Sequence, residues 1–336
     1  MKVLVTGSTG FIGGALCRLL CEQGYQVVAF HRSSSALRLL EDLPVEHAIG
    51  DLTQPATIQA AMSGVEAVFH AGALLGTGQP GRSYAVTVQG TQSLLQAARV
   101  AGVRRVVHTS SVAALGIPEP GRRNGRGLLT ESHCWNYRPD YWPYGYAKYL
   151  AEQEVQRAVS LGQDVVIVNP SLVYGPGDIY RQANSPVVQV ARQKLPFITE
   201  AGVNVVNLED VVAGHLAALE RGKRGERYIL GGENLTIQHL VGMMAELAGV
   251  PAPNLLLPPN LVRTLSRVLG AFQSFLQLPL GVSELRLAGY YFYYETRKAQ
   301  RELGLGQPRP ARQAVEDALN WFAQDGAMKL KTSRSA

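Results

Sequence analysis

Residues 2–13 read KVLVTGSTGFIG, and this stretch decides the fold. Val3, Leu4 and Val5 form a short apolar run without polar alternation, which is typical of a strand buried on both faces of a parallel sheet. Three glycines in the pattern G-x-x-G-x-x-G follow, and an apolar stripe of helical period comes next. A strand, a glycine turn and a helix in this order form the unit that seats a dinucleotide pyrophosphate on a helix N-terminus.

The glycines of this turn have separate expected roles. Gly7 would allow the tight turn, Gly10 would let the backbone approach the phosphates, and Gly13 would let the helix pack closely on the strand. Glycines also punctuate ordinary turns, but this pattern follows a strand and opens a helix. We therefore predict a dinucleotide site with contacts from Gly7, Thr9, Gly10, Phe11, Ile12 and Gly13.

The length and composition indicate a globular chain with a large core. Its 336 residues, 46% of them hydrophobic and 17% charged, suffice for one large domain or for two that share a cleft. No apolar run approaches the about 18 residues of a membrane span, and the N-terminus does not resemble a signal peptide. The three cysteines are expected to be small buried side chains in a reducing compartment. Neither they nor the seven histidines show the spacing of metal ligands. We expect a cytoplasmic protein with no metal site and no membrane span.

The net charge of +6 suits anionic cofactors and substrates. Nucleic acid would be the other partner of a basic chain, but the sequence contains neither a nucleic-acid-binding motif nor a basic helix. A cluster of Arg122, Arg123 and Arg126 could grip an anionic substrate, although a solvated surface is the simpler interpretation. We expect a small-molecule substrate and no nucleic acid.

The end of the second expected strand bears on the choice between NAD and NADP. After the apolar residues 26–30 the chain reads His31-Arg32-Ser33-Ser34-Ser35. In this fold an acidic residue here binds the ribose 2′-hydroxyl of NAD, whereas an arginine accommodates the 2′-phosphate of NADP. No carboxylate is present, and Arg32 could make charge-assisted bonds to a phosphate, although it could also be a solvated loop arginine. We predict NADP(H), with contacts from His31 and Arg32, and keep NAD(H) as the alternative.

Two further strands, expected over 43–48 and 67–70, precede candidate cofactor contacts. Asp51, followed by Leu52, could accept a bond from the adenine amine or could cap a helix over 55–62. Small residues after the next strand would let the backbone lie against the cofactor: Ala71, Gly72 and Ala73. The strand's last residue, His70, is interpreted as a packed histidine and not a catalytic one.

Hydroxyl groups gather at the end of the fifth expected strand, residues 105–108. Thr109, Ser110 and Ser111 follow it, where open α/β sheets bind their ligands. A helix is expected before this strand, over 86–101. The region 116–143 is rich in Gly, Pro and Arg and shows no period, so we predict a long loop over the site.

A tyrosine and a lysine then share one helix face. Tyr144 and Lys148 stand at i and i+4 in the sequence YGYAK, which opens a helix. A phenol is a poor acid or base at neutral pH, but a cation one turn away favours the phenolate and eases proton transfer. Tyr146 has Leu150 at the same spacing. Such pairs are common on amphipathic helices, so the surrounding fold decides the meaning of this one.

The rest of the chain is expected to form a second lobe. A sixth strand, over 165–168, runs into Asn169, Pro170 and Ser171. The predicted division is a dinucleotide-binding domain over 1–170, to which 203–222 returns, and a substrate lobe over 171–202 and 223–326, with a disordered tail over 327–336. We thus predict an α/β fold, a Rossmann-type doubly wound parallel sheet with a smaller C-terminal lobe.

Helix caps are expected at two places in this part of the chain. Asp210 would cap the helix over 210–219, and a capped helix would run from Thr236 to Ala248. The apolar positions over 261–276 keep helical spacing, and we expect them to pack in the lobe and not on a membrane surface.

Taken together, these motifs resemble those of the extended short-chain dehydrogenases/reductases, also called the NAD-dependent epimerase/dehydratase family. The resemblance covers nearly the whole chain through TGSTGFIGG, GDL, VFHAGA, HTSSVAALG, YGYAK and VNPSLVYGPGD. The segments VNVVNLEDVVAGHLAALERG and GERYILGGENLT are similar to those of dihydroflavonol-4-reductase-like proteins, 3β-hydroxysteroid-dehydrogenase-like proteins and hopanoid-associated sugar epimerases.

The resemblance implies a catalytic set of three residues. Tyr144 would exchange a proton with the substrate oxygen, Lys148 would bind the nicotinamide ribose and hold the Tyr144 proton equilibrium, and Ser111, in preference to Ser110, would bond the same oxygen. Thr109 is a further expected cofactor contact, and Pro170 and Ser171 would approach the nicotinamide end.

Three departures from the family pattern narrow the function. Thr87 stands where an Asn commonly supports the active site. Val112 and Ala113 replace the acidic pair of sugar dehydratases, which argues against dehydration. The residues 202–204 replace the Arg-Asp that nucleotide-sugar enzymes usually carry before the strand that returns from the second lobe.

We therefore predict an NADP(H)-dependent reductase or dehydrogenase acting on a ketone or secondary alcohol. The alternatives are a sugar epimerase with a retained NAD and a non-catalytic dinucleotide-sensing protein; the latter predicts a broken Ser/Tyr/Lys set. The resemblance also suggests a homodimer through the helices at 87–101 and 144–160.

Overall fold

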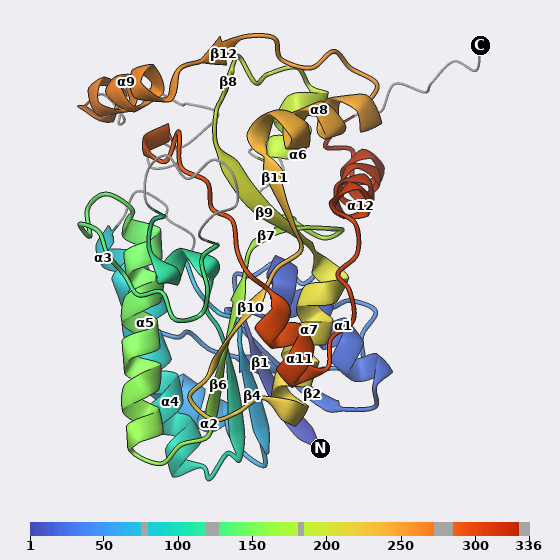
Figure 1. Cartoon of the computed structure of the whole chain (residues 1–336). Coiled ribbons are helices and arrows are strands. Elements are labelled where there is room, and N and C mark those ends of the chain that lie inside the picture. Colours follow the sequence, from blue (N-terminus) through green and yellow to red (C-terminus); the bar gives the residue numbers. More distant parts are fainter. Residues whose placement is uncertain (75–79, 119–127, 181–184, 272–284, 329–336) are drawn as a thin grey trace.

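The structure, a computed structural model, describes residues 1–74, 80–118, 128–180, 185–271 and 285–328 (Figure 1). A seven-stranded sheet with helices on both faces forms its larger part, and a smaller lobe lies beyond the carboxyl ends of the strands. The predicted Rossmann-type doubly wound fold is confirmed.

The strand order of the large sheet is β10-β6-β5-β4-β1-β2-β3, and all neighbours pair in parallel. The order reverses between β1 and β4, and open α/β sheets bind their ligands in the crevice at such a switch point. The strands are β1 Lys2–Thr6, β2 Gln26–His31, β3 Glu46–Ile49, β4 Ala67–His70, β5 Arg105–Thr109, β6 Val165–Pro170 and β10 Arg227–Leu230.

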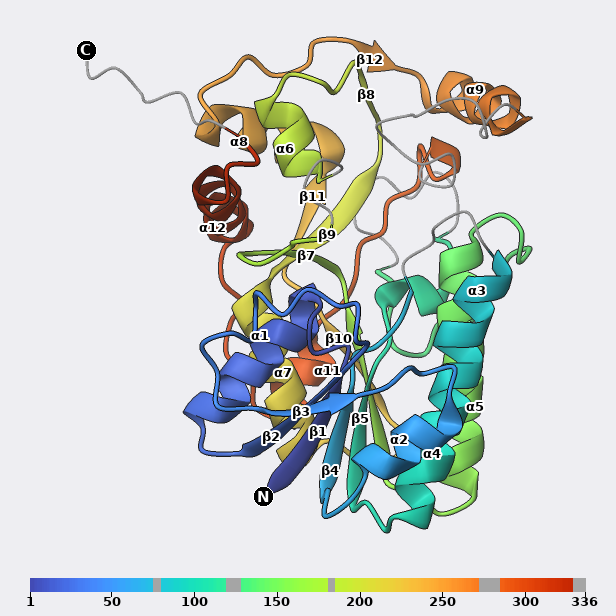
Figure 2. The same ribbon diagram turned by 180° about the vertical axis from the view of Figure 1, so that it is seen from behind.

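Helices cover both faces of this sheet, as the two opposite views show (Figures 1 and 2). One face carries α1 (Phe11–Glu22), α7 (Leu208–Arg221) and α11 (Arg297–Leu303), and the other carries α2 (Pro55–Ala61), α4 (Gly90–Val100) and α5 (Pro143–Ser160). Val3 and Val5 pack in the core of the first face, whereas Leu4 packs in that of the second. Burial on both faces therefore explains why β1 reads as a continuous apolar run.

Two predicted elements differ in their bounds. The strand expected over 43–48 is β3, Glu46–Ile49, because Leu43 and Val45 lie in turns bonded back to Leu40 and Leu43. The helix expected over 86–101 is divided into a π-helical segment, η1 (Ala85–Gln89), and α4, and a further short helix, α3 (Pro80–Tyr84), precedes it. Periodicity reports only the shared helical face and so does not separate these pieces.

The smaller lobe is built on a three-stranded sheet of order β11-β9-β7. Its strands are β7 Leu172–Tyr174, β9 Gly202–Asn207 and β11 Glu233–Thr236. The helices α6 (Pro186–Ala191), α8 (Ile237–Leu247) and α12 (Ala311–Gln324) share one apolar core with it. The short strands β8 (Ile198–Thr199) and β12 (Leu256–Leu257) pair at its outer end, beside α9 (Pro259–Ala271).

The course of the chain differs from the predicted division. Strand β9, expected in the dinucleotide-binding domain, pairs with β7 and β11 in the lobe, while α7 does pack on the large sheet. Conversely, β10 and α11 belong to the large sheet and its helical layer, because β10 buries its apolar residues beside β6. Ala327 and Met328, expected in the tail, pack against the lobe core, and 329–336 lie outside the described residues.

The two expected helix caps have different outcomes. Asn207, and not Asp210, caps α7, and its Oδ1 accepts a hydrogen bond of 2.8 Å from the amide of Glu209. Asp210 lies in the first turn and binds Arg309 instead. Thr236 caps α8 as predicted, since its Oγ1 accepts from the amide of His239 at 3.1 Å.

Within the described ranges no helix is long and apolar enough to span a membrane.

Candidate active site

The glycine turn is packed so closely that side chains would not fit. Gly7 has a φ of 66°, and a Cβ there would lie 2.8 Å from the Cα of Gly72. A Cβ on Gly13 would lie 2.1 Å from the Gly7 oxygen. Gly10 is the N-cap of α1, has no capping side chain, and precedes a first turn without acidic residues. Among the described residues no side chain caps the first amides of α1, which fits a bound pyrophosphate there.

The expected contacts at the adenosine end lie near one another. His31 is buried, with its Nε2 3.0 Å from Nδ1 of His47, whereas Arg32 is exposed. The backbone bond from Thr53 is the main cause of the lowered pKa of Asp51, and the positive charges of Arg32 and Arg82 add to it. The positive charge of Arg32 thus acts on the carboxylate of Asp51.

Asp51 is not a helix cap. Its Oδ1 accepts hydrogen bonds of 2.8 Å from both the amide and the hydroxyl of Thr53, and Gln54 occupies the N-cap of α2. The carboxylate closes a local turn before the helix, which corrects one of the two predicted roles.

The end of β4 closes against the glycine turn. The amide of Gly72 donates to Oγ1 of Thr6 at 3.1 Å, and a Cβ on Gly72 would lie 2.7 Å from Cδ1 of the buried Leu52. Its neighbours Ala71 and Ala73 are partly exposed. The backbone of this segment is therefore held next to Gly7.

His70 is a packed histidine, as predicted. Its Nδ1 lies 2.7 Å from Oγ1 of Thr6, and its Nε2 lies 3.0 Å from Oγ1 of Thr91. Burial lowers its pKa to about 3, and the charge of Lys148 adds to this effect. His70 is therefore neutral at physiological pH.

Helix α5 brings the predicted lysine to the end of β5. Lys148 is only 4% exposed, and its Nζ donates a 2.9 Å hydrogen bond to the main-chain oxygen of Thr109. Burial lowers the pKa of Lys148 to about 8, and the negative charge of Glu152 opposes that shift. Tyr144 is partly buried one turn earlier on the same helix face. Lys148 can therefore change its protonation state near neutral pH, one helical turn from the phenol of Tyr144.

The side chain of Thr109 points away from this lysine bond toward α7. Its Oγ1 lies 2.9 Å from Nε2 of His215, whose Nδ1 lies 2.7 Å from the carbonyl oxygen of Val211. A carbonyl accepts only, so Nδ1 carries the proton and Nε2 accepts from the threonine hydroxyl. Thr109 therefore offers its carbonyl, and not its hydroxyl, to Lys148.

Ser111 is the partly exposed hydroxyl at the end of β5. It caps the short 3₁₀ helix η2 (Val112–Leu115), and its Oγ accepts from the amide of Ala113 at 3.2 Å. Ser110 is buried and donates a 2.5 Å bond to Oε1 of Glu152. Ser110 is thus already bonded within the protein.

Gly145 is a site residue that sequence reasoning missed. A Cβ at this position would lie 2.8 Å from the main-chain oxygen of Ala113 and 2.8 Å from the Trp135 ring. The glycine therefore lets the start of α5, which carries Tyr144, pack closely on the helical turn that follows Ser111. Its place between the two tyrosines of YGYAK was the available signal.

The end of β6 completes this edge of the sheet. Pro170 is its last residue, and the amide of Ser171 donates to the oxygen of Leu230 at 3.1 Å. The Oγ of Ser171 is buried and has no hydrogen-bond partner among the described residues. An unbonded hydroxyl at a strand end fits a position where a ligand would supply the partner.

The expected long loop is tied to the lobe. The amide of Leu129 donates to the Tyr293 oxygen at 2.9 Å, and the hydroxyl of Tyr141 donates to the Arg286 oxygen at 2.7 Å. The aromatic segment 290–294 therefore lies beside the loop. Arg122, Arg123 and Arg126 lie outside the described residues.

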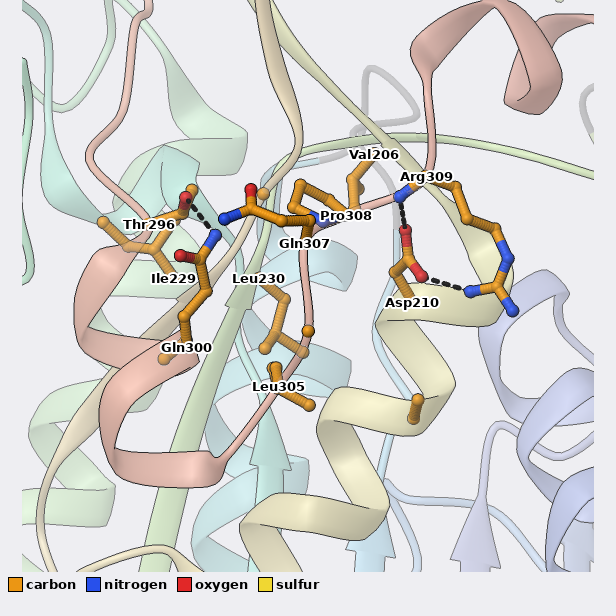
Figure 3. A pocket seen from close by; sticks show the side chains of 14 residues that line it. Val206, Asp210, Ile229, Leu230, Thr296, Gln300, Leu305, Gln307, Pro308 and Arg309 are labelled. Carbon is orange, nitrogen blue, oxygen red and sulfur yellow. Dashed lines mark hydrogen bonds and ion pairs between the residues drawn. The ribbon is translucent and has the colours of Figure 1, made fainter.

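A separate pocket of about 380 Å³ lies between α7, β10, α11 and the segment 305–309 (Figure 3). Asp210 binds both the amide and the guanidinium of Arg309 at its rim. None of the 14 residues that line it is a predicted site residue. This pocket is therefore distinct from the residues of the candidate active site.

The cysteines and possible metal ligands form no site in the described part of the chain. No group of three or more His, Cys, Asp or Glu side chains there could hold a metal ion. All three cysteines are free, and Cys134 is exposed, in contrast to the expected burial. It lies in the irregular segment 128–142, outside the helices and strands.

Known proteins match this chain over nearly its whole length. The model of the NAD dependent epimerase/dehydratase family matches residues 3–231. A protein from Synechocystis sp., provisionally named dihydroflavonol 4-reductase, is 38% identical over 97% of this chain and 96% of its own length. Sterol demethylase protein B from Methylococcus capsulatus is 35% identical over 97% and 99%. The crystal structure of gox2253 superposes with a TM-score of 0.84 at 37% identity, covering 98% of this chain and 99% of that one.

Proposed function

The chain belongs to the NAD-dependent epimerase/dehydratase family, and we propose that it is an NADP(H)-dependent oxidoreductase acting on a ketone or secondary alcohol. One observation carries this proposal. The buried amine of Lys148 is held by the carbonyl of Thr109 at the strand end that bears Ser111, one helical turn from Tyr144. This arrangement supports a proton donor, a cation and a hydroxyl acting together at the edge of the sheet where the fold binds its ligands.

The bound cofactor would supply or accept a hydride at its nicotinamide. The glycine turn and the first amides of α1 would hold its pyrophosphate. The ammonium of Lys148 would bond the nicotinamide ribose and favour the ionised form of Tyr144. Tyr144 would give its proton to the carbonyl oxygen as the hydride reaches carbon, and Ser111 would donate a hydrogen bond to that oxygen. In the reverse direction Tyr144 would accept the proton of the alcohol.

Two features support the choice of NADP(H). Arg32 is exposed directly after β2, and the polar residues Ser33 to Ser35 follow it. The position that would carry a carboxylate in an NAD-selective site holds no acid. We therefore propose that Arg32 binds the 2′-phosphate.

The substrate is proposed to be a ketone carried on an apolar molecule. The segment 290–294 brings four tyrosines and a phenylalanine beside the loop 128–142. The rings of Trp142 and Phe292 pack edge to face, with their centroids 5.4 Å apart. The names of the two relatives, a dihydroflavonol reductase and a sterol demethylase protein, support a ring-containing substrate. Aromatic walls suit such molecules because they bury large apolar areas.

The test is NADPH oxidation with a panel of apolar ring ketones, and the matching alcohols with NADP. Tyr144→Phe should lower turnover at least about 100-fold and leave NADPH affinity nearly unchanged, because only the proton donor is lost. Tyr146→Phe is the control, since Tyr146 has Leu150 and no cation one turn later. Turnover retained by Tyr144→Phe would refute the proposed mechanism.

The description of the family also supports a second candidate, an epimerase that oxidises and re-reduces a sugar on a retained NAD. Denaturing the purified protein and identifying the released nucleotide separates the two. Stoichiometric NAD would favour the epimerase and contradict the proposed role of Arg32. No nucleotide, or weakly held NADP, would favour the oxidoreductase.

We also propose a homodimer through α4 and α5, which pack side by side on one face of the sheet. Light scattering after gel filtration should give about twice the chain mass of 36.3 kDa. A mass equal to that of one chain would contradict this assembly.

A further inference from the structure

We propose that Glu152 is a positioning residue whose buried carboxylate clamps the end of β5 to α5 and supplies the countercharge for Lys148. No motif in the sequence singled out this residue. The inference rests on the proposed function, because it assigns to Glu152 the support of Ser111, Tyr144 and Lys148. Glu152 would support these three residues and would not itself touch the reacting atoms.

The first support is the position of Glu152. It lies one helical turn after Lys148 on α5, so the two side chains share a helix face. Its side chain is 0% exposed. A carboxylate is rarely buried without partners, because removing the charge from water is costly.

The second support is the set of three partners that hold this carboxylate, two of them on strands and one at the end of a third strand. Ser110, just beyond β5, donates its hydroxyl to Oε1 at 2.5 Å, and Asn169 on β6 donates Nδ2 to the same oxygen at 2.7 Å. Arg227 on β10 places its Nε 2.7 Å from Oε2. One carboxylate on α5 thus joins the carboxyl-terminal side of β5 and β6 to the edge strand β10.

The third support is that these partners also bear on the proposed catalytic set. Ser110 stands between Thr109, whose carbonyl accepts from Lys148, and Ser111. The Nδ2 of Asn169, which binds Glu152, also donates to the carbonyl oxygen of Ser111 at 2.9 Å. Movement of the Glu152 carboxylate would therefore displace the backbone on both sides of Ser110.

The fourth support is the charge around Lys148. His70 on β4 and His108 on β5 are buried beside it, and burial lowers the pKa of each below the ordinary value. Burial raises the pKa of Glu152, while Arg227, Ser110, Asn169 and Lys148 favour its ionised form. Glu152 is the group that raises the pKa of Lys148 against burial. A single carboxylate therefore lies between two cations, Lys148 and Arg227.

The experiment follows the protonation of Lys148 directly. The chain has seven lysines, so protein labelled with ¹³C at lysine Cε gives few NMR resonances, and Lys148→Met assigns the one of interest. In Glu152→Gln the titration midpoint of Lys148 should fall by about one pH unit, because an opposite charge close by is lost. Glu152→Asp keeps the charge and should restore most of that shift. An unchanged midpoint in Glu152→Gln would overturn the countercharge role.

Ser110→Ala is the matched control for the clamp. It removes one hydrogen bond to Glu152 but keeps the carboxylate, so the Lys148 midpoint should stay at the wild-type value. Amide hydrogen exchange over 110–114 should quicken in both Ser110→Ala and Glu152→Gln, because the end of β5 is released. Unchanged exchange in both variants, or an equal fall of the midpoint in Ser110→Ala, would overturn the proposal.

Glu152→Gln leaves the guanidinium of Arg227, whose side chain is only 13% exposed, beside a neutral amide, and this threatens folding. If that variant does not fold, the double variant Glu152→Gln/Arg227→Gln removes both charges of the ion pair and should show the same fall in midpoint. These titrations need no substrate and no turnover. A failure of the proposed oxidoreductase activity would therefore be recognised separately, from the ketone panel.

Discussion

The Nζ of Lys148 lies 2.9 Å from the main-chain oxygen of Thr109, so the amine of α5 is bonded to the carboxyl end of β5. This contact joins the two segments that carry the proposed catalytic groups, because Ser111 follows Thr109 by two residues and Tyr144 precedes Lys148 by one helical turn. The lysine therefore has a structural partner in addition to its proposed cofactor.

Lys148→Met should weaken NADPH binding at least about tenfold, because a charge-assisted hydrogen bond to the ribose would be lost. Fluorescence titration of the protein with NADPH measures this, and circular dichroism shows whether the fold is kept. Lys194→Met, at an exposed position after α6, is the control and should bind as the wild type does. Equal affinity of Lys148→Met and the wild type would contradict the ribose contact.

Arg32→Ala should lower the affinity for NADPH about tenfold or more and leave that for NADH nearly unchanged, since only NADPH carries the 2′-phosphate. The ratio of the two dissociation constants is the measurement. Arg38→Ala is the matched control in the same loop, because Arg38 pairs with Asp325 instead. A ratio that does not change in Arg32→Ala would move the choice of cofactor toward NAD.

Gly13→Ala should lower the free energy of unfolding by about 2 kcal/mol or more, because the new Cβ would meet the Gly7 oxygen at 2.1 Å. The opposite sign is expected for Gly242→Ala in α8, where a Cβ meets nothing within 4 Å. That change should stabilise the protein by about 0.5–1 kcal/mol through helix propensity. Urea unfolding of both variants tests the pair, and a stable Gly13→Ala would contradict the close packing of the turn.

The free energy of unfolding should fall as the pH drops below about 6.5. Burial lowers the pKa of His70 to about 3 and that of His215 to about 4. Between the unfolded pKa of about 6.5 and these values, the unfolded chain binds protons that the native protein cannot, so each histidine costs about 2 kcal/mol at pH 5. Urea unfolding at pH 7 and pH 5 measures the loss. His215→Asn should lose about 2 kcal/mol less than the wild type over that interval, and an equal loss would contradict the assignment.

The large sheet and the glycine turn could be predicted because local patterns specify them. The apolar run of β1 indicated burial on both faces of the sheet, and the spacing of Gly7, Gly10 and Gly13 indicated a close turn into a helix. The shared face of Tyr144 and Lys148 follows from the helical repeat alone. The assignment of β9 and β10 was wrong, because both strands are short apolar runs of similar pattern. Nothing in such a run states which sheet edge it will join.

The sequence by itself therefore determined the fold class, the dinucleotide turn and the helix face that carries Tyr144 and Lys148, since each depends on residues within a few positions of one another. Only the tertiary structure decided what lies behind that face. Glu152 meets Ser110 across 42 positions and Asn169 across 17, and Gly145 meets the backbone of Ala113. Such contacts arise when a helix is pressed on a sheet to bury its apolar side, and the buried carboxylate must then find its partners among the strand ends that the packing places beside it.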